Sequence, residues 1–324
     1  MILGGYGQLG RLCAQELAGR SRAPIVVAGR SLQRAESLAL SFGERARGVY
    51  ANALDPRTLA RAVEGAGLLV ACCGGDQIVA LQVALELRVP FIGVSPLRIE
   101  ARSRALVAEQ AWRAQVPVVL SAGAVPGIPG IAAELLVRQL PSIRQLRIAS
   151  TGAWVETETA RRDVQLASVE QGEDSGTVGL RRRIPELWRF AEPIGMRPVV
   201  PSSSADLDGF CESHCVETLS YLEPPRGVIG RSLGRLVSRQ AEPGFALAAI
   251  ARAGPEPGSK ATISLEFFAP NALVPAAALI GALGVEILEG HAPAGLSTPR
   301  EVLRPAVALL ALEKRGVRVS QASS

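Results

Sequence analysis

Three glycines near the start of the chain have the spacing of a phosphate-binding loop. Residues 5–10 read Gly-x-Gly-x-x-Gly, between a short apolar segment and a run with helical character from Arg11 to Ala18. In a dinucleotide site the first glycine makes a tight turn, the second lets the backbone approach a pyrophosphate, and the third lets helix and strand pack closely. The motif therefore predicts a dinucleotide site, and its candidate contacts are Gly5, Tyr6, Gly7, Gln8, Leu9 and Gly10.

The end of the next predicted strand indicates which dinucleotide binds. Residues 24–28 form a short β-branched run that leads into Gly29, Arg30 and Ser31. NAD enzymes usually carry a carboxylate at this point, which binds the ribose 2′-hydroxyl, and this chain has none. An arginine can bind a phosphate through two N–H groups, and a serine hydroxyl adds a donor. We therefore predict NADP as the cofactor, although Arg30 could also be a surface residue that ends a strand.

The first part of the chain alternates strands and helices. Strands are expected at 48–53, 68–73, 90–94 and 116–120, with helices at 32–42, 78–87 and 100–115 and a helix that begins after Asp55 and Pro56. Such alternation predicts a parallel, doubly wound sheet. Ligands bind at the carboxyl ends of its strands, which adds three groups of candidates. They are Cys73 and Gly74, Ser95, and Ser121 with Gly123 beside the nicotinamide.

The pattern changes after Gly123. A turn-rich segment, 124–130, precedes a helix at 131–140, and residues 142–268 read as strands separated by polar or proline-rich loops. The end of the chain reads as helices at 276–289 and 302–315. We therefore expect an α/β protein with an inserted α+β domain that carries a mostly antiparallel sheet. The expected divisions are residues 1–123 for the Rossmann domain, 124–270 for the substrate and dimerisation domain, and 271–324 for helices that return to the first domain.

Composition excludes several classes of protein. The 324 residues are 48% hydrophobic and carry a net charge of +5, and aromatic residues make up only 4%. Scarce aromatics and scattered arginines argue against a nucleic-acid surface. No stretch reads as a membrane span or a secretory signal, so we expect a cytoplasmic protein with small-molecule ligands. Five cysteines suggest reduced thiols, and Cys211, His214 and Cys215 do not have the spacing of a zinc site, so no metal is expected.

Several segments together resemble the saccharopine dehydrogenase family of NADP-dependent oxidoreductases. Its cofactor elements are similar to residues 4–10 and 28–31, and its interdomain motif is similar to 122–127, with Ala124 in place of a phenylalanine. Residues 175–177 resemble a shortened Ser-Gly-Gly-Thr loop of the family, and residues 277–281, 295–301 and 315–317 resemble its C-terminal part. These pieces occur in the family's order over almost the whole chain.

The resemblance implies a Rossmann domain interrupted by an α+β domain, a homodimer formed through that second domain, and a substrate cleft between the domains. It implies hydride transfer between NADP(H) and the C–N bond of a secondary amine or imine, on a small substrate that carries a carboxylate. Some relatives instead reduce enoyl or other conjugated carbonyl groups. Candidate substrate contacts are Ser121, Pro126, Gly127, Trp154, Ser175 and Thr177. Trp154 is equally compatible with core packing.

The chain departs from the family pattern in ways that bear on the substrate. Phe91 and Gly93 replace the tyrosine and aspartate of an aromatic-x-Asp segment, and Asn52 replaces an aspartate. These changes enlarge or neutralise the pocket, which argues against the usual amino-acid substrates. We expect a divergent member, from a specialised biosynthetic pathway.

The general acid is less clear than the cofactor. Histidine is the residue type best suited to proton transfer near neutral pH, so His214, on a strand predicted at 213–222, is the first candidate proton donor, with Tyr221 the second. For both residues the sequence favours the alternative of a structural role, as a hydrogen-bonded residue of a strand. Two other functions stay open, namely a non-catalytic NADP-binding sensor or partner protein and a dehydrogenase that uses Cys72 or Cys73 as a nucleophile.

Overall fold

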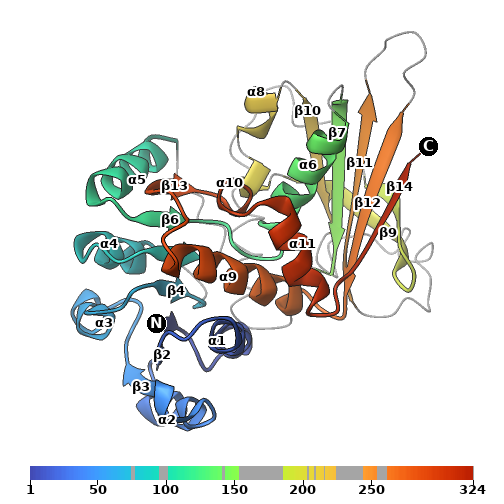
Figure 1. The fold of residues 1–324 in the computed structure, drawn as a ribbon. Coiled ribbons are helices and arrows are strands. Elements are labelled where there is room, and N and C mark those ends of the chain that lie inside the picture. Colours follow the sequence, from blue (N-terminus) through green and yellow to red (C-terminus); the bar gives the residue numbers. More distant parts are fainter. Residues whose placement is uncertain are drawn as a thin grey trace. The chain divides into compact units, whose positions relative to one another are not determined.

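The computed structural model describes residues 1–73, 77–94, 101–140, 143–152, 185–202, 204–207, 209–214, 216–223, 244–253 and 261–323. The chain forms two compact units, each of which contains two stretches of sequence (Figure 1). The first unit is Met1–Gly127 with Ala276–Ala311, and the second is Ile128–Pro275 with Leu312–Ser324. The expected divisions are at 123/124 and 270/271, and Leu312–Ser324 belong to the second unit, whereas the sequence predicts that residues 271–324 return to the first domain.

The first unit has a parallel sheet in the order β13-β6-β5-β4-β1-β2-β3. Its strands are β1 (Ile2–Leu3), β2 (Ile25–Gly29), β3 (Ala46–Tyr50), β4 (Leu69–Ala71), β5 (Phe91–Gly93), β6 (Pro117–Val119) and β13 (Gly295–Ser297). The connecting helices are α1 (Gln8–Arg20), α2 (Leu32–Leu40), α3 (Pro56–Val63), α4 (Ile78–Glu86) and α5 (Ala101–Ala114). The strand order reverses at β1, so the predicted doubly wound α/β fold is confirmed.

Local sequence explains where several of these helices begin. Ser31 caps α2, because its side chain accepts a hydrogen bond from the N–H of Arg34. Asp55 caps α3 in the same way, and Pro56 occupies the first turn, as the sequence predicts. The central strands are short but fully buried, since β4 and β5 expose none of their three residues. Apolar packing on both faces therefore holds them.

The second unit has a mixed sheet in the order β14-β12-β11-β7-β10-β9-β8. Its strands are β7 (Ile143–Thr151), β8 (Glu186–Phe190), β9 (Gly195–Pro201), β10 (Glu217–Leu222), β11 (Phe245–Ala253), β12 (Thr262–Ala269) and β14 (Arg318–Ser323). β7 and β10 pair in parallel and the other pairs are antiparallel. The expected α+β domain with a mostly antiparallel sheet is therefore confirmed.

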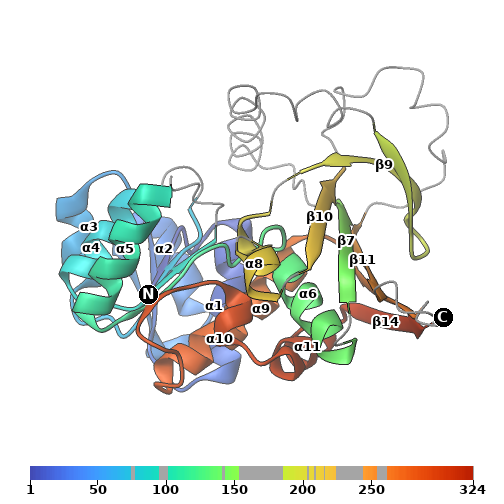
Figure 2. The same ribbon diagram turned by 90° about the horizontal axis from the view of Figure 1, so that it is seen from above.

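Different elements cover the two faces of this sheet. Helix α6 (Ile128–Gln139) packs against β7, β11 and β12. Figure 2 shows the hairpin of β8 and β9 on the other side of these strands. There Trp188 and Phe190 of β8 join a buried cluster with Ala149 and Ala248. The hairpin therefore provides a second hydrophobic core for this unit.

The C-terminal part of the chain differs from the expectation of helices alone. After α9 (Leu273–Leu288), residues of β13 pair with β6 at the edge of the first sheet. After α10 (Pro299–Val302) and α11 (Pro305–Glu313), residues of β14 pair with β12 in the second sheet. β13 has only three residues and β14 is almost entirely exposed, so neither shows an alternating apolar pattern, and the edge of an existing sheet supplies the hydrogen-bond partners of each.

Candidate dinucleotide-binding site

The glycine loop lies directly between β1 and α1. The N–H of Gly5 donates to the carbonyl of Ala28 at 3.0 Å, and the N–H of Gly7 donates to the carbonyl of Gly4 at 2.9 Å. Gly4 has φ +73°, a conformation that strongly favours glycine. These bonds close the tight turn that the sequence predicts at this position.

Two of the motif glycines are required by close packing. A Cβ at Gly10 would lie 2.3 Å from the carbonyl oxygen of Gly4, and one at Gly5 would lie 2.8 Å from that of Ile2. Any side chain at these positions would collide with backbone. Glycine at positions 5 and 10 therefore lets the first turn of α1 pack closely against the end of β1, which is the role of the third glycine in a dinucleotide loop.

Gly7 is different, because the space beside it is open. It has φ −68° and ψ 170°, and a Cβ there would meet only the carbonyl oxygen of Gly4, at 3.1 Å. Gly7 and Gln8 are exposed, and no side chain caps α1. The first-turn amides of α1 are therefore available to an anion, and the open face of Gly7 lets a phosphate approach them.

Tyr6 links the glycine loop to the end of β2. Its hydroxyl accepts a hydrogen bond from the backbone N–H of Ser31 at 3.0 Å. Its ring lies against Gly29, where a Cβ would be 2.5 Å from the ring. The guanidinium of Arg34 lies 4.6 Å from the ring centroid on the first turn of α2. Arg34 is not among the candidate site residues of the sequence analysis, and its position four residues after Arg30 is the only signal for it in the sequence.

Uncompensated positive charge surrounds this arrangement. Arg11, Arg30 and Arg34 are exposed, and no carboxylate among the described residues forms an ion pair with any of them. A cavity of about 580 Å³ adjoins Tyr6, and none of the described residues that line it is acidic. Its lining residues come from the fingerprint loop, α1 and α2, namely Tyr6, Arg11, Gln15, Gln33, Arg34, Ser37, Leu38 and Ser41. This region suits a ligand that carries several negative charges.

Gln77 shapes the end of β4. Its side chain is fully buried, and its amide nitrogen donates to the carbonyls of Ala71 at 2.9 Å and Cys73 at 2.8 Å. The backbone of Cys72 and Cys73 lies about 3 Å from a Cβ placed at Gly4, so this strand end supports the glycine loop. Gly74, which the sequence also predicts as a cofactor contact, lies outside the described residues, as does Ser95 after β5.

Gly93 has no room for a side chain. A Cβ there would lie 2.9 Å from the ring of Phe91, 3.1 Å from the side-chain oxygen of Gln77 and 3.2 Å from Leu120. Neighbouring side chains occupy the space beside Gly93, and the expectation of an enlarged or neutralised pocket stays a prediction. Asn52 makes local bonds, since its side chain accepts from the N–H of Leu54 at 3.2 Å.

The segment after β6 forms a compact loop. Ser121 is buried and has φ 63°, which is uncommon for a residue other than glycine. A Cβ at Gly127 would lie 2.2 Å from the carbonyl oxygen of Gly123, and Pro126 follows a cis peptide bond. The structure thus brings together Ser121, Gly123, Pro126 and Gly127, whereas Trp154, Ser175 and Thr177 lie outside the described residues.

His214 lies on a helix, and the strand expected at 213–222 begins later. Residues Phe210–His214 form α8, and β10 starts at Glu217. The imidazole stacks on Phe210, with 4.3 Å between ring centroids, and its Nε2 lies 3.7 Å from a carboxylate oxygen of Glu134. Hydrogen bonds of Nδ1 with the hydroxyl of Ser213 and the carbonyl of Phe210 favour the helical turn. The short segment has no period that could have revealed it.

Tyr221 is buried on β10 beside an arginine. The Arg147 guanidinium donates to the Tyr221 hydroxyl at 3.0 Å and to Glu186 at 2.5 Å. It also lies 5.0 Å from the ring of Tyr221 and 5.1 Å from that of Trp188. Hydrogen bonds to Tyr221 and Glu186 raise the pKa of Arg147 against the opposing effect of burial, so this arginine stays charged.

Asp206 is a buried carboxylate that the sequence analysis missed. It is fully buried, and it accepts hydrogen bonds from the N–H of Gly130 at 2.6 Å and the hydroxyl of Ser204 at 2.5 Å. Gly130 is in the first turn of α6, so the carboxylate caps this helix across 76 residues of sequence. The preceding serines gave no signal of this distant contact.

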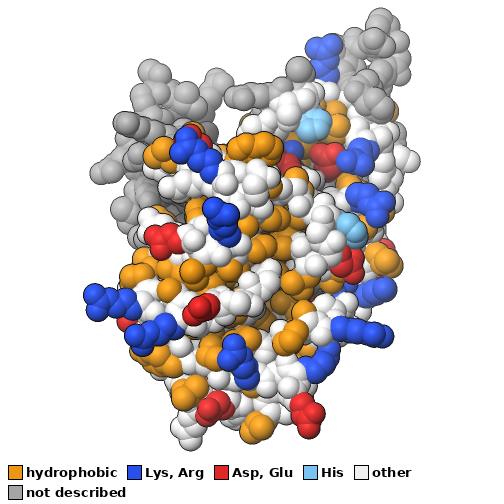
Figure 3. Space-filling model, turned by 60° about the vertical axis from the view of Figure 1, so that its left-hand side comes forward, with side chains coloured by type: hydrophobic (Ala, Val, Ile, Leu, Met, Phe, Trp, Pro, Cys, Tyr) orange, Lys and Arg blue, Asp and Glu red, His pale blue; other side chains and the backbone are white. Residues whose placement is uncertain are grey.

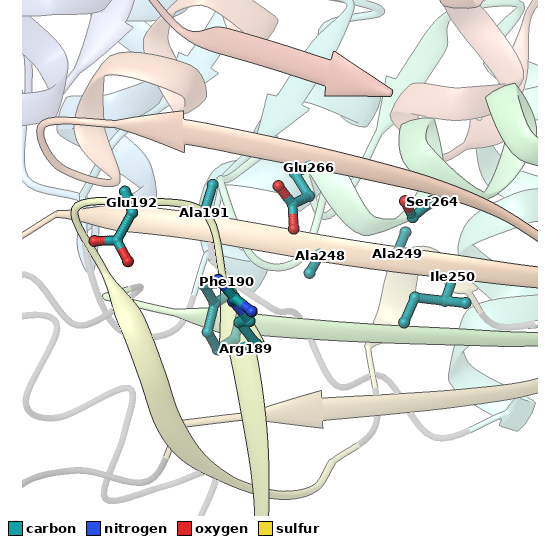
Figure 4. A pocket seen from close by; sticks show the side chains of 9 residues that line it. All are labelled: Arg189, Phe190, Ala191, Glu192, Ala248, Ala249, Ile250, Ser264 and Glu266. Atoms are coloured by element: carbon teal, nitrogen blue, oxygen red, sulfur yellow. The ribbon is translucent and has the colours of Figure 1, made fainter. Parts of the chain in front are cut away.

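A second cavity, of about 450 Å³, lies in the second unit. Figure 4 shows Glu192 at the β8–β9 turn and Glu266 and Ser264 on β12 around it. Of the residues predicted for the substrate pocket, Ser121, Pro126 and Gly127 do not line this cavity, and the other three lie outside the described residues.

Three further features concern only the part of the chain that the structure describes, namely metal-ligand groups, membrane-spanning helices and surface charge. There, no three His, Cys, Asp or Glu side chains are grouped so that they could hold a metal ion. No helix in the same ranges has the length and apolar character to cross a membrane. On the face in Figure 3, the basic and acidic side chains of these residues are interspersed with hydrophobic ones and form no continuous patch of one sign.

The sheet order and the glycine loop together define a Rossmann-type unit combined with an α+β unit. The same fold occurs in saccharopine dehydrogenase (L-Glu forming) from Saccharomyces cerevisiae, with a TM-score of 0.69 and 13% identity over 100% of this chain and 99% of that chain. A probable dehydrogenase from Thermotoga maritima has a TM-score of 0.53 and 11% identity over 99% and 97% of the two chains. GenD2 from gentamicin A biosynthesis, solved in complex with NAD, has a TM-score of 0.51 and 13% identity over 100% and 95%.

At these identities the likeness establishes the fold that the chain shares with saccharopine dehydrogenase and other Rossmann-type dehydrogenases. No protein-family model matches the sequence, and no curated protein sequence matches it.

Proposed function

We propose that this protein is an NADP(H)-dependent oxidoreductase and a divergent member of the saccharopine dehydrogenase family. The observation that carries the proposal is the basic region around the glycine loop, where Arg11, Arg30 and Arg34 have no carboxylate partner among the described residues. The open face of Gly7 and the first turn of α1 would hold the pyrophosphate. Arg30, Ser31 and Arg34 would bind the 2′-phosphate.

The bound nicotinamide supplies the hydride chemistry, so the protein has to orient the substrate and hold a proton. Ser121 and Gly123, at the carboxyl end of β6, are the proposed nicotinamide neighbours. His214 and Tyr221 remain the proposed proton donors, and the His214 imidazole lies 3.7 Å from a carboxylate oxygen of Glu134. If His214 donates it, His214→Ala should lower turnover by about 100-fold or more.

The proposed substrate is a small imine or secondary amine that carries a carboxylate. The absence of a carboxylate at Gly93 supports a substrate other than the usual amino acids, and it also favours the alternative of an enoyl or other conjugated carbonyl group. NADPH oxidation in the presence of amine–carbonyl pairs, and separately of enoyl compounds, distinguishes these classes. No turnover with either class, together with tight NADPH binding, would favour a non-catalytic NADP-binding sensor.

Cofactor titration tests the central proposal. NADPH and NADH are each titrated into the protein while nicotinamide fluorescence is followed. We expect NADPH to bind well ahead of NADH, because Arg30 and Arg34, which would bind the 2′-phosphate, have no carboxylate partner among the described residues. Equal affinity, or preference for NADH, would overturn the assignment. Light scattering at micromolar concentration tests the proposed homodimer.

A further inference from the structure

Two cysteines meet beneath the glycine loop. Cys13 lies on α1 and is completely buried, and Cys72 directly follows β4 and is half-buried. Their thiols are hydrogen-bonded, with 3.7 Å between the two Sγ atoms, although 59 residues separate them in sequence. Neither is in a disulfide. The proposed hydride transfer uses neither thiol.

The sulfur atoms are close enough to be joined by a small movement of the two side chains together with α1. A disulfide has an S–S distance of about 2.05 Å, so the two sulfurs would have to approach by somewhat under 2 Å. The two side chains come from facing elements, the helix α1 and the strand β4, and they already point toward one another. A single bond could therefore connect these elements without a change of fold.

We propose that Cys13 and Cys72 are an oxidisable thiol pair that a hydroperoxide converts into a disulfide. In the first step the Cys72 thiolate attacks hydrogen peroxide, the O–O bond breaks, and Cys72 sulfenic acid and one water form after uptake of a proton. In the second step the Cys13 sulfur displaces hydroxide from the sulfenic acid, which leaves as water with the Cys13 proton. Both sulfurs are oxidised, and peroxide is reduced to two waters.

The surroundings of the two thiols assign their order of reaction. Cys72 is the half-exposed member, so peroxide can reach it. Burial raises the pKa of the Cys13 thiol well above its usual value, with the hydrogen bond and charge of Cys72 as further causes. Cys13 therefore stays protonated, which leaves Cys72 as the thiol that reacts with peroxide first. Conversion of Cys72 into an uncharged sulfenic acid removes the charge that opposes ionisation of Cys13.

A bond at this place would act on the glycine loop. The N–H of Cys72 donates to the carbonyl of Leu3 at 2.9 Å, and a Cβ at Gly4 would lie 3.1 Å from the Cys72 carbonyl. At the start of α1, Gly10 packs against Gly4 with no free space. The glycine loop packs tightly against Cys72 at Gly4 and against the start of α1 at Gly10. A shift of α1 toward β4 must therefore move the loop. We expect the disulfide to weaken dinucleotide binding, and a bound dinucleotide to slow disulfide formation by the same coupling.

The bond itself is tested on the full-length wild-type protein. Protein treated with hydrogen peroxide and untreated protein are alkylated, digested and analysed by mass spectrometry. The expected result is a linked pair of peptides that contain Cys13 and Cys72, lighter by two hydrogen atoms than the separate peptides and restored by dithiothreitol. Alkylation of both thiols after peroxide treatment would overturn the proposal, as would a bond between Cys72 and Cys73.

Single substitutions test which of the three cysteines, Cys13, Cys72 and Cys73, form the disulfide. Cys73→Ser is the matched control and should still form the bond, because Cys73 is adjacent to Cys72 but does not take part. Cys13→Ser should leave Cys72 to oxidise further, to sulfinic acid, and Cys72→Ser should leave Cys13 reduced. Reduced Cys13 in wild-type protein, under conditions that oxidise Cys72, would contradict the role of Cys13.

Only the effect on binding rests on the proposed function. NADPH affinity of the wild-type protein should fall by about tenfold or more after peroxide treatment and recover with dithiothreitol, while Cys13→Ser keeps its affinity. Unchanged affinity of the disulfide form would refute the coupling but leave the bond established. Failure of the reduced protein to bind any dinucleotide would refute the proposed function, and the peptide result would still decide the thiol pair.

Discussion

The hydroxyl of Tyr6 accepts a hydrogen bond from the backbone N–H of Ser31, 3.0 Å away and 25 residues later in the chain. This bond joins the glycine loop, which would hold the pyrophosphate, to the loop that would hold the 2′-phosphate. Arg34 covers the same tyrosine ring, so one side chain positions elements of both proposed phosphate sites.

Tyr6→Phe should therefore affect both stability and NADPH binding. The ring and its contact with Arg34 remain, but the part-buried N–H of Ser31 loses its acceptor, which costs about 1 kcal/mol in unfolding free energy. NADPH affinity should fall more than NADH affinity, because only NADPH carries the 2′-phosphate. Urea unfolding and cofactor titration measure the two effects. A variant with the stability and the NADPH affinity of the wild type would show that this hydrogen bond does not connect the two proposed phosphate sites.

Arg30→Ala should weaken NADPH binding by about 1.5–3 kcal/mol and hardly change NADH binding, since a charge-assisted contact with the 2′-phosphate is lost. Arg22→Ala is the matched control, because Arg22 is an exposed arginine that precedes β2, whereas Arg30 follows it. The control should bind both cofactors as the wild type does. Equal losses in the two variants would indicate a general charge effect.

Gly7 and Gly10 should respond differently to substitution. Gly7→Val should fold, because its backbone angles suit any residue and the space is open, but it should not bind a dinucleotide. Gly10→Ala should lose fold stability, because its Cβ would lie 2.3 Å from a carbonyl oxygen. Circular dichroism with cofactor titration separates the outcomes. Tight binding by Gly7→Val would mean that the loop holds no phosphate.

Asp206→Ala should destabilise the second unit by about 1–3 kcal/mol, because the N–H of Gly130 loses its acceptor in a buried place. Asp206→Asn keeps one side-chain oxygen as an acceptor and should lose less. Thermal unfolding of both variants gives the comparison. An alanine variant as stable as the wild type would show that α6 needs no such cap.

The stability of a chain that starts at Met1 should rise with pH between about 5 and 8. Burial lowers the pKa of the Met1 amine from 8.0 to about 5, although the amine donates to the carbonyl of Leu68 at 2.7 Å. In this window the unfolded chain binds a proton that the folded chain does not, so stability increases as pH rises to 8. The full shift corresponds to about 4 kcal/mol.

Urea unfolding between pH 5 and 8 measures this slope. A variant with Gly-Ser added before Met1 is the control, because its amide at Met1 can still donate to Leu68 but has no charge. Its slope should be smaller by the contribution of the amine. Equal slopes would show that the amine is protonated in the folded chain.

The sequence by itself determined the features that depend on neighbours along the chain. The glycine spacing, the β-branched run before Arg30 and the Asp55–Pro56 helix start all act within a few residues, and the structure has them where they were predicted. The alternation of strands and helices was also sufficient for the class of each sheet, because periodicity reports which face of an element is buried.

Tertiary structure alone decided the features that join distant segments. β13 and β14 are strands because the edges of existing sheets supply their hydrogen bonds. The bond from Gly130 to Asp206, the contact of Cys13 with Cys72 and the bond from Ser31 to Tyr6 join residues 76, 59 and 25 positions apart. No local pattern encodes such pairs, since each arises only when packing brings two segments together.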